Sequence, residues 1–229
     1  MKPEPLVSVI ISVFNDQERI AKAINSIINQ TYENIEILVI DDGSTDDTLI
    51  RIKSLNSQKV KIFTNDKNIG LTKSLNILIK NSKGDFIARQ DADDFSHPER
   101  ISTQLNYIKK YNLDAVGSRA NIQNSKIKLP GLSFYFPMKF QVLFKNPLIH
   151  GTLLIRKKSL VNLGLYDENF YYSQDYKMLI DLLNEKMNIR IINKFLYDLN
   201  IDNNISTNFK KEQREYFLKA KRYYKFFNL

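Results

Sequence analysis

The sequence predicts an α/β fold in which a mostly parallel sheet carries helices on both faces. Short apolar runs alternate along the chain with segments whose apolar residues recur at helical spacing. Because the runs are almost continuously apolar, the strands they form should be covered on both sides. A βαβαβ succession of this kind favours right-handed crossovers and a doubly wound sheet. The expected strands of the first half are Val7–Val13, Ile35–Ile40, Val60–Thr64 and Phe86–Ala88.

Two helices are expected between these strands. The first has an apolar stripe over Ile20–Ile28, and Asn15 and Asp16 are its candidate caps. The second follows Gly70 and repeats the stripe over Leu71–Leu78. Both helices fall where the crossovers of a parallel sheet are needed.

Beyond the fourth strand the pattern becomes less regular. The segment Ser96–Glu99 has the sequence of a capping box and should open a helix that ends near Lys110. Ser173 can cap a later helix, whose apolar positions begin at Met178. The other elements expected here are a strand over Leu113–Gly117, a loop or lid over Asn121–Met138, a strand over Thr152–Arg156, and a short helix over Lys158–Leu163 that Gly164 stops.

Composition excludes several classes of protein. The 229 residues contain no cysteine, which rules out disulfides and thiol catalysis. No apolar run approaches the length that spans a bilayer, and the first residues lack the pattern of a secretory leader, so we expect a cytoplasmic protein. The chain has neither a Gly-x-Gly-x-x-Gly nor a Gly-Lys-Ser/Thr motif, which argues against a dinucleotide dehydrogenase or a P-loop NTPase.

The net charge of +9 is partly concentrated in residues 207–229, where basic and aromatic side chains alternate. Two interpretations stay open for this expected helix. Its aromatic side can pack on the domain with the lysines in solvent, or it can lie on an anionic membrane surface on the inner face of the membrane. Nucleic acid is not expected as a partner.

Polar segments follow three of the expected strands. They are Ser12–Asn15, Asp41–Asp46 and Arg89–Asp94. Because ligands of open α/β sheets bind beyond the carboxyl ends of the strands, these segments should meet at one rim. Gly43 allows a sharp turn, and Asp42 can take the ribose or base of a nucleotide; the alternative for Asp41–Asp46 is a helix cap.

Crowded carboxylates in the third segment suggest a metal. Asp91 and Asp93 stand two residues apart, so on an extended segment they would point to the same side. Oxygen ligands favour Mg²⁺ or Mn²⁺, and a site with few protein ligands completes its shell with water and substrate phosphates. The alternative is a solvated acidic loop in which Asp94 or Ser96 caps the next helix.

Asp175 is expected in the first turn of the helix after Ser173. A carboxylate at this position is favoured by the helix dipole, which is a sufficient structural reason for it. The functional alternative is a general base.

In their order and spacing, these segments resemble the family 2 glycosyltransferases, which have the GT-A fold. The resemblance lies between residues 6 and 200. It rests on Val7–Asn15, Asp41–Asp46, Asn68–Leu71, Arg89–Asp94 with Pro98–Arg100, and Gly164–Asp175. The resemblance implies that Ser12, Phe14 and Asp42 lie at the donor nucleotide, and that Asp91 faces the ribose or the diphosphate. It also implies that Asp93 binds the metal and that Asp175 is the catalytic base.

Four further residues complete the candidate site. We include Asn15, Arg89 and Ala92 with the donor-binding residues because they belong to the same polar segments. His150 matches a recurring His-Gly-Thr element of the family, although a lone histidine is more often a structural hydrogen-bonding residue than a ligand.

The resemblance implies an inverting transfer of a sugar from a nucleotide-diphospho-sugar, with a UDP-sugar favoured, to an acceptor hydroxyl. The acceptor would be a saccharide or a lipid-linked saccharide in surface polysaccharide or glycolipid assembly. A metal-dependent nucleotidyltransferase and a non-catalytic sugar-nucleotide-binding protein are the alternatives. The expected domain is 1–206, with a nucleotide-binding half (1–112) and an acceptor half (113–206), followed by the basic helix of 207–229.

Overall fold

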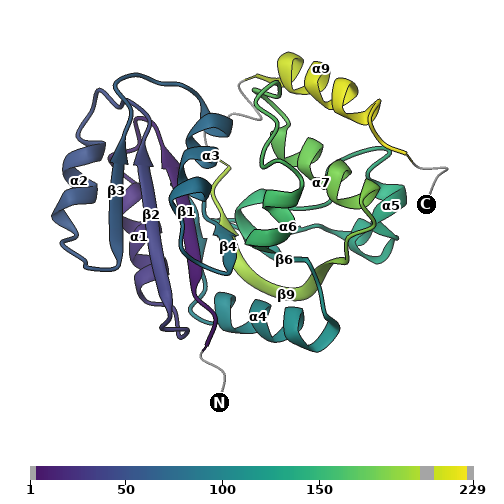
Figure 1. Cartoon of the computed structure of the whole chain (residues 1–229), viewed down its shortest axis with the longest axis horizontal. Helices are drawn as coiled ribbons and strands as arrows, with labels where there is room; N and C mark the ends of the chain where they lie inside the picture. Colours follow the sequence, from purple (N-terminus) through teal and green to yellow (C-terminus); the bar gives the residue numbers. More distant parts are fainter. Residues whose placement is uncertain (1–3, 202–208, 226–229) are drawn as a thin grey trace.

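The protein is built on one mixed, curled sheet with helices packed on both sides (Figure 1). The computed structural model describes residues 4–201 and 209–225. The sheet runs in the order β3-β2-β1-β4-β8-β6-β9-β5, and β7 pairs with β6 outside this path. The strand order reverses at β1, as in a doubly wound sheet. The predicted α/β class is therefore confirmed.

The first half supplies the parallel part of the sheet. The four strands are β1 (Val7–Val13), β2 (Ile35–Asp41), β3 (Val60–Thr64) and β4 (Phe86–Arg89). All three pairings among them are parallel, so the carboxyl ends of β1, β2 and β4 lie at one edge. The expectation that all four strands are covered on both faces was wrong for β3. It is the edge strand of the sheet, with one neighbouring strand only, and most of its side chains are exposed.

Helices follow each strand of this half. They are α1 (Ile20–Ile28), α2 (Thr48–Ser54), α3 (Leu71–Asn81) and α4 (Arg100–Tyr111). The sequence did not predict α2, a short helix with few buried side chains. Asp46 accepts a hydrogen bond from the Thr48 amide (3.0 Å) in a turn just before this helix, whereas the N-cap residue Asp47 makes no capping hydrogen bond with its side chain.

The predicted caps of three helices are wrong. No side chain caps α1; Asn15 instead contacts the loop after β2, and the Asp16 amide donates to Thr48 at the start of α2. Ser96–Glu99 is not a capping box, because Ser96 lies in the short strand β5 (Phe95–Ser96) and donates to Gln90 (2.6 Å). Neither Asp94 nor Ser96 caps α4. Ser173 does precede its helix, but its hydroxyl contacts Gln213 of the C-terminal helix.

The second half adds antiparallel and long-range pairings. Its strands are β6 (Ala115–Ile122), β7 (Lys128–Leu129), β8 (Leu154–Arg156) and β9 (Ile189–Leu199). β8 joins β4 to β6 and so makes the sheet continuous across both halves. The predicted loop over Asn121–Met138 was wrong in part, since it contains the end of β6, β7 and the 3₁₀ turn η1 (Leu132–Tyr135) and ends where α5 begins.

The remaining helices are short, apart from two. They are α5 (Met138–Gln141), the 3₁₀ turn η2 (His150–Thr152), α6 (Lys157–Asn162), α7 (Gln174–Asn184) and α9 (Lys210–Lys221). Gly164, with φ +85°, follows α6 as predicted. None of the helices in the described part of the chain has both the length and the apolar character needed to span a bilayer.

Two apolar cores cover the two faces of the sheet. One contains Ile10 and Leu38 of the strands with side chains of α3, α6 and α7. The other contains Val9 and Ile37 with side chains of α1, α2 and α4. Adjacent residues of one strand thus face opposite cores, which explains why most positions of β1 and β2 are apolar on both faces.

The C-terminal helix α9 lies against α7 at the end of the molecule away from α2 (Figure 1). Phe217 stacks on Tyr176 with ring centroids 4.3 Å apart, and Tyr216 packs edge-on against Phe170. Most of the basic residues of α9 are exposed. The described part of the segment therefore packs its aromatic side on the domain, and residues 207, 208 and 226–229 lie outside the described residues.

Candidate active site

A cavity of about 1290 Å³ opens at the carboxyl ends of β1, β2 and β4. Its size exceeds that of a typical pocket for one small ligand and leaves room for a donor and an acceptor together. All ten side chains predicted from the sequence line it. They are Ser12, Phe14, Asn15, Asp42, Arg89, Asp91, Ala92, Asp93, His150 and Asp175.

Asn15 joins the loops that follow β1 and β2. Its side-chain oxygen accepts a hydrogen bond from the Thr45 amide (2.8 Å), and its own amide donates to Ser44 Oγ (2.9 Å). The backbone of Asn15 is left-handed, with φ 51°, a conformation that asparagine tolerates well. The neighbouring Phe14 ring is 46% exposed at the cavity, so a flat face remains available for stacking.

Asp42 organises the loop before α3. Its buried carboxylate accepts hydrogen bonds from the side chain of Asn65 (2.7 Å) and from the amides of Ile69 (3.0 Å) and Gly70 (2.9 Å). Gly70 has φ +94°, and a Cβ there would meet the Tyr171 ring. The Asp42 carboxylate thus lines the cavity and, through these hydrogen bonds, fixes the loop that forms this part of the cavity wall.

A buried network fixes Asp91. The guanidinium of Arg89, which is 1% exposed, donates to the Asp91 carboxylate (2.6 Å), and the Asp91 amide donates to the Tyr197 hydroxyl (3.0 Å). Behind them, Arg100 donates to the carbonyl oxygens of Gly151 (2.7 Å) and Arg89 (2.9 Å). Burial lowers the pKa of Arg100 to about 10, which still leaves it charged at neutral pH. The two buried guanidinium groups, of Arg89 and Arg100, thus lie next to the acidic segment and stabilise its position.

Asp91, Asp93 and Asp94 crowd one another as their spacing predicted. They do not follow an extended segment, because residues 92 and 93 form a turn, yet Asp91 and Asp93 both reach the cavity. Burial and the charge of Asp91 raise the pKa of Asp93 to about 6. Asp94 is buried, its Oδ1 accepts from the Asn200 amide (2.7 Å), and burial with its acidic neighbours raises its pKa to about 8.

The acidic segment is compatible with a divalent ion held mainly by substrate. The described residues contain no cluster of three carboxylate or imidazole groups that would enclose a metal by themselves. Mg²⁺ and Mn²⁺ sites commonly use only one or two protein carboxylates together with water and phosphates, and Asp91 and Asp93 offer that donor set at the cavity. The nearest cation to Asp93 is Arg19, whose Nη1 lies 3.7 Å from Oδ2.

Asp175 lies in the first turn of α7 and lines the same cavity as the acidic segment. Its Oδ2 accepts a hydrogen bond from Asn146 Nδ2 (2.7 Å). Asn146 is itself fixed, because its Oδ1 accepts from the Leu148 amide (3.1 Å). Burial raises the pKa of Asp175 above its ordinary value, while the Asn146 and backbone hydrogen bonds oppose that change. A carboxylate with a raised pKa suits proton acceptance.

His150 is a neutral, hydrogen-bonded side chain. Burial and the nearby charge of Arg89 lower its pKa to about 3, so the imidazole carries no charge at working pH. Its Nε2 lies 2.8 Å from the Tyr166 hydroxyl. His150 lines the cavity but cannot supply a positive charge to a phosphate.

Several cavity residues were not predicted from the sequence. Asn146 was missed, although it stands in an Asn-Pro pair just before the His-Gly-Thr element. Arg19 lies in no motif, and Tyr171 and Tyr172 lie within the Gly164–Asp175 segment but were not named as site residues. The helix α9 also contributes one wall, through Gln213, Arg214, Phe217, Leu218 and Lys221. Long-range packing, which the sequence pattern does not record, brings these residues to the site.

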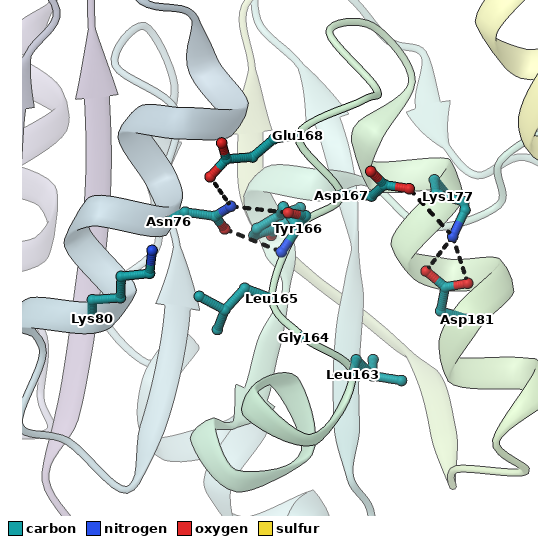
Figure 2. A pocket seen from close by; sticks show the side chains of 10 residues that line it. All are labelled: Asn76, Lys80, Leu163, Gly164, Leu165, Tyr166, Asp167, Glu168, Lys177 and Asp181. Carbon is teal, nitrogen blue, oxygen red and sulfur yellow. Dashed lines mark hydrogen bonds and ion pairs between the residues drawn. The ribbon is translucent and has the colours of Figure 1, made fainter.

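A second cavity, of about 410 Å³, lies between α3 and α7 (Figure 2). Three of its charged groups pair with one another: Lys177 contacts Asp181 (2.7 Å) and Asp167 (3.8 Å). Asn76 donates to the Tyr166 carbonyl and to Glu168. These interactions tie the segment before α7 to α3, so the smaller cavity has a structural explanation.

The fold and the site together define a GT-A type protein, an α/β class with a ligand cavity at the strand ends. The structure of Staphylococcus aureus TarS 1–349 in complex with UDP-GlcNAc matches 94% of this chain and 65% of that one, with a TM-score of 0.74 and 20% identity. The mannosyltransferase PcManGT of Pyrobaculum calidifontis, in complex with GDP-Man and Mn²⁺, matches 96% of this chain and 64% of that one, with a TM-score of 0.76 and 15% identity. At these identities the likeness shows the fold.

The family follows from the sequence comparisons. The profile of "Glycosyl transferase family 2" matches residues 8–180. An uncharacterized glycosyltransferase of Haemophilus influenzae is 36% identical over 190 residues, which cover 76% of this chain and 58% of that protein. The chain belongs to glycosyl transferase family 2. It spans 57% to 62% of the length of the first curated relatives it matches.

A relative with a stated reaction is also similar. The Escherichia coli protein WfgD is a UDP-Glc:α-D-GlcNAc-diphosphoundecaprenol β-1,3-glucosyltransferase. It is 30% identical over 190 residues, which cover 82% of this chain and 73% of WfgD.

Proposed function

We propose that this protein transfers a sugar from a nucleotide-diphospho-sugar to an acceptor hydroxyl. The observation that carries the proposal is one large cavity lined both by the acidic segment, Asp91 and Asp93, and by a half-buried carboxylate, Asp175, that Asn146 holds. Membership of glycosyl transferase family 2 and the ligands named for TarS and PcManGT support the same class of donor.

In the proposed reaction Asp175 accepts the proton of the acceptor hydroxyl. The hydroxyl oxygen then forms a bond to the anomeric carbon while the bond from that carbon to the diphosphate breaks, and the nucleoside diphosphate leaves. Attack from the face opposite the leaving group inverts the anomeric carbon and needs only one base. A retaining hydrolase, in contrast, needs a second carboxylate as nucleophile.

Other residues of the cavity would bind the donor. Phe14 offers a ring face to the base, and Asp42 and Ser12 border the same region. Asp93, with Asp91 beside it, would hold Mn²⁺ or Mg²⁺ together with the diphosphate. Such an ion would neutralise the charge that develops on the departing diphosphate. Arg89 keeps the Asp91 carboxylate oriented toward this region.

For the acceptor we propose a lipid-linked saccharide in surface polysaccharide or glycolipid assembly, on the cytoplasmic side of the membrane. The similarity to WfgD supports this class of acceptor, and the same relative supports a UDP-sugar as donor.

Asp175→Asn tests the proposal. We expect turnover of the donor to fall by at least about 100-fold, because an amide cannot accept the proton. Donor binding, measured as the rise in melting temperature with a nucleotide diphosphate and Mn²⁺, should remain. Glu185→Gln, an exposed carboxylate at the other end of the same helix, is the matched control and should leave both measurements unchanged.

The same assay separates the alternatives. Release of pyrophosphate would indicate a nucleotidyltransferase, and donor binding without turnover across a panel of acceptors would indicate a non-catalytic binding protein. Full turnover by Asp175→Asn would rule out Asp175 as the base.

A further inference from the structure

A long central segment of the chain carries only positive charge. Residues 115–166 contain no aspartate and no glutamate. They contain eight basic residues, which are Arg119, Lys126, Lys128, Lys139, Lys145, Arg156, Lys157 and Lys158. The basic excess of the protein therefore has a second centre besides the C-terminal segment, and the partner that matches it must be anionic.

Apolar side chains are exposed in the same segment. Leu132 is 84% exposed, Tyr135 70%, Phe136 65% and Phe144 80%. Phe140 is 46% exposed as well. Single exposed apolar residues are ordinary, but five large ones within thirteen consecutive residues indicate a surface that contacts something apolar. Two exposed lysines, Lys139 and Lys145, lie among them.

The segment folds into one unit, defined here as the docking loop, residues 131–145. Its two ends meet where Lys145 Nζ donates to Ser133 Oγ (2.6 Å). The ring of Phe134 is covered from the protein side by the Arg119 guanidinium (5.1 Å). Interior contacts therefore fix the loop while Leu132 and Phe136 remain in solvent.

The docking loop lies beside the C-terminal helix and borders the cavity. The Tyr224 hydroxyl donates to the carbonyl of Lys139 (3.0 Å). Phe144 and Lys145 of the loop line the active-site cavity together with Leu218 and Lys221 of α9. Apolar and basic residues from two distant parts of the sequence thus form one rim of the cavity.

We propose that the docking loop and the neighbouring face of α9 bind the protein to a bilayer that contains anionic phospholipid. The lysines would contact lipid phosphates, while the exposed leucine and aromatic rings enter the interface between head groups and acyl chains. A single strand of nucleic acid would also match the charge, but it offers no apolar medium for an aliphatic side chain such as Leu132.

Docking in this way places the mouth of the cavity at the lipid surface. An acceptor sugar carried on a membrane lipid would then reach Asp175 without leaving the bilayer. This consequence rests on the proposed function, whereas lipid binding itself does not depend on glycosyl transfer and is measured without donor or acceptor.

Vesicle co-sedimentation of the full chain tests the inference. The probes are vesicles of phosphatidylethanolamine with phosphatidylglycerol and, for comparison, vesicles of phosphatidylcholine alone. We expect binding to the anionic vesicles, with at least about tenfold weaker binding to the neutral ones and a strong decrease with added salt. Binding that is absent, or equal for both vesicles, would overturn the proposal.

Three double variants assign the surface. Leu132→Ser with Phe136→Ser, and Lys139→Glu with Lys145→Glu, should each weaken binding to the anionic vesicles by about tenfold or more. The control is Ile50→Ser with Lys53→Glu on α2, at the far side of the molecule, where Ile50 is 64% exposed (Figure 1). It should bind as the unchanged protein does.

Thermal melts of each variant check that the fold is retained. Because the substituted side chains are exposed, the melting temperatures should stay close to that of the unchanged protein. Unchanged vesicle binding by folded variants of the loop would overturn the proposal, as would an equal loss in the control. Salt-sensitive binding to an oligonucleotide without binding to vesicles would overturn it in favour of nucleic acid.

Discussion

At the scale of single residues, the hydrogen bond from Asn146 affects the pH at which Asp175, a residue that lines the cavity, becomes ionised. Burial disfavours the ionised carboxylate and raises its pKa, and the hydrogen bond from Asn146 favours the ionised form. As the proposed base, Asp175 must be ionised to act, so we expect activity above this pKa and its loss as the pH falls through it. The acidic limb of the rate profile should lie above the pH at which an ordinary aspartate titrates.

Asn146→Ala should move that limb to higher pH. Loss of one hydrogen bond to a charged group corresponds to about 1.5 kcal/mol, or about one pH unit. The measurement is kcat/KM against pH, and donor binding at high pH should be little changed. Asn81→Ala removes an exposed amide that contacts only its own helix and should leave the profile where it is. A limb that stays in place in Asn146→Ala would contradict this role for Asn146.

The same residues mark what the sequence could predict of the site. Asp91, Asp93 and Asp175 were found because strand ends, helix starts and clustered charge are local patterns. Asn146 was not, because its partner lies 29 residues away and no local pattern records the contact. The contact between Tyr197 and Asp91 spans 106 residues and was invisible for the same reason.

At the scale of elements, continuous apolar runs predicted the strands well, whereas polar residues near the helix starts predicted the helix caps poorly. The bounds of β1 were correct because both faces of this strand are buried, so every position is constrained to be apolar or small. The predicted caps failed because Asn15 and Ser173 have tertiary partners, Thr45 and Gln213, that compete for their polar groups. The segment after β6 was taken for a loop because its elements are too short to show a period.

Gly43 was predicted from the sequence as the residue that permits the turn after β2. Its φ is +75°, and a Cβ there would lie 2.5 Å from the carbonyl carbon of Lys67 and 2.7 Å from its Cα. The positive φ and the close contact with Lys67 both involve backbone atoms, which cannot shift without a substantial cost in free energy. Gly43→Ala should therefore lower the free energy of unfolding by about 1–3 kcal/mol, measured by denaturant titration.

Gly164 provides the control for that substitution. Its φ is also positive, at +85°, but an added Cβ there would meet no atom within 4 Å. Gly164→Ala should therefore cost only the backbone strain, about 1 kcal/mol. Equal losses in the two variants would contradict the argument that the Lys67 backbone contact adds to the cost at Gly43.

At the scale of the whole molecule, the two halves expected from the sequence, residues 1–112 and 113–206, share one sheet. The strands β1 and β4 of the first half continue through β8 to β6 of the second. One apolar core contains Ile10 and Leu38 together with Leu179 of α7. Neither half can bury this core alone, so the structure predicts that the halves unfold together.

Leu179→Ala tests that cooperativity. Leu179 is fully buried, and its truncation should lower the free energy of unfolding by about 2–5 kcal/mol. Thermal unfolding followed by far-ultraviolet circular dichroism and by tyrosine fluorescence should give one coincident transition, shifted to lower temperature by about 2–4 °C for each kcal/mol. The same exchange at an exposed site, Leu132→Ala, should leave the transition within about 1 °C of its original position. Two separated transitions in either variant would instead mark residues 1–112 and 113–206 as domains that fold independently. A core that contains side chains of both β1 and α7 must come apart in one transition.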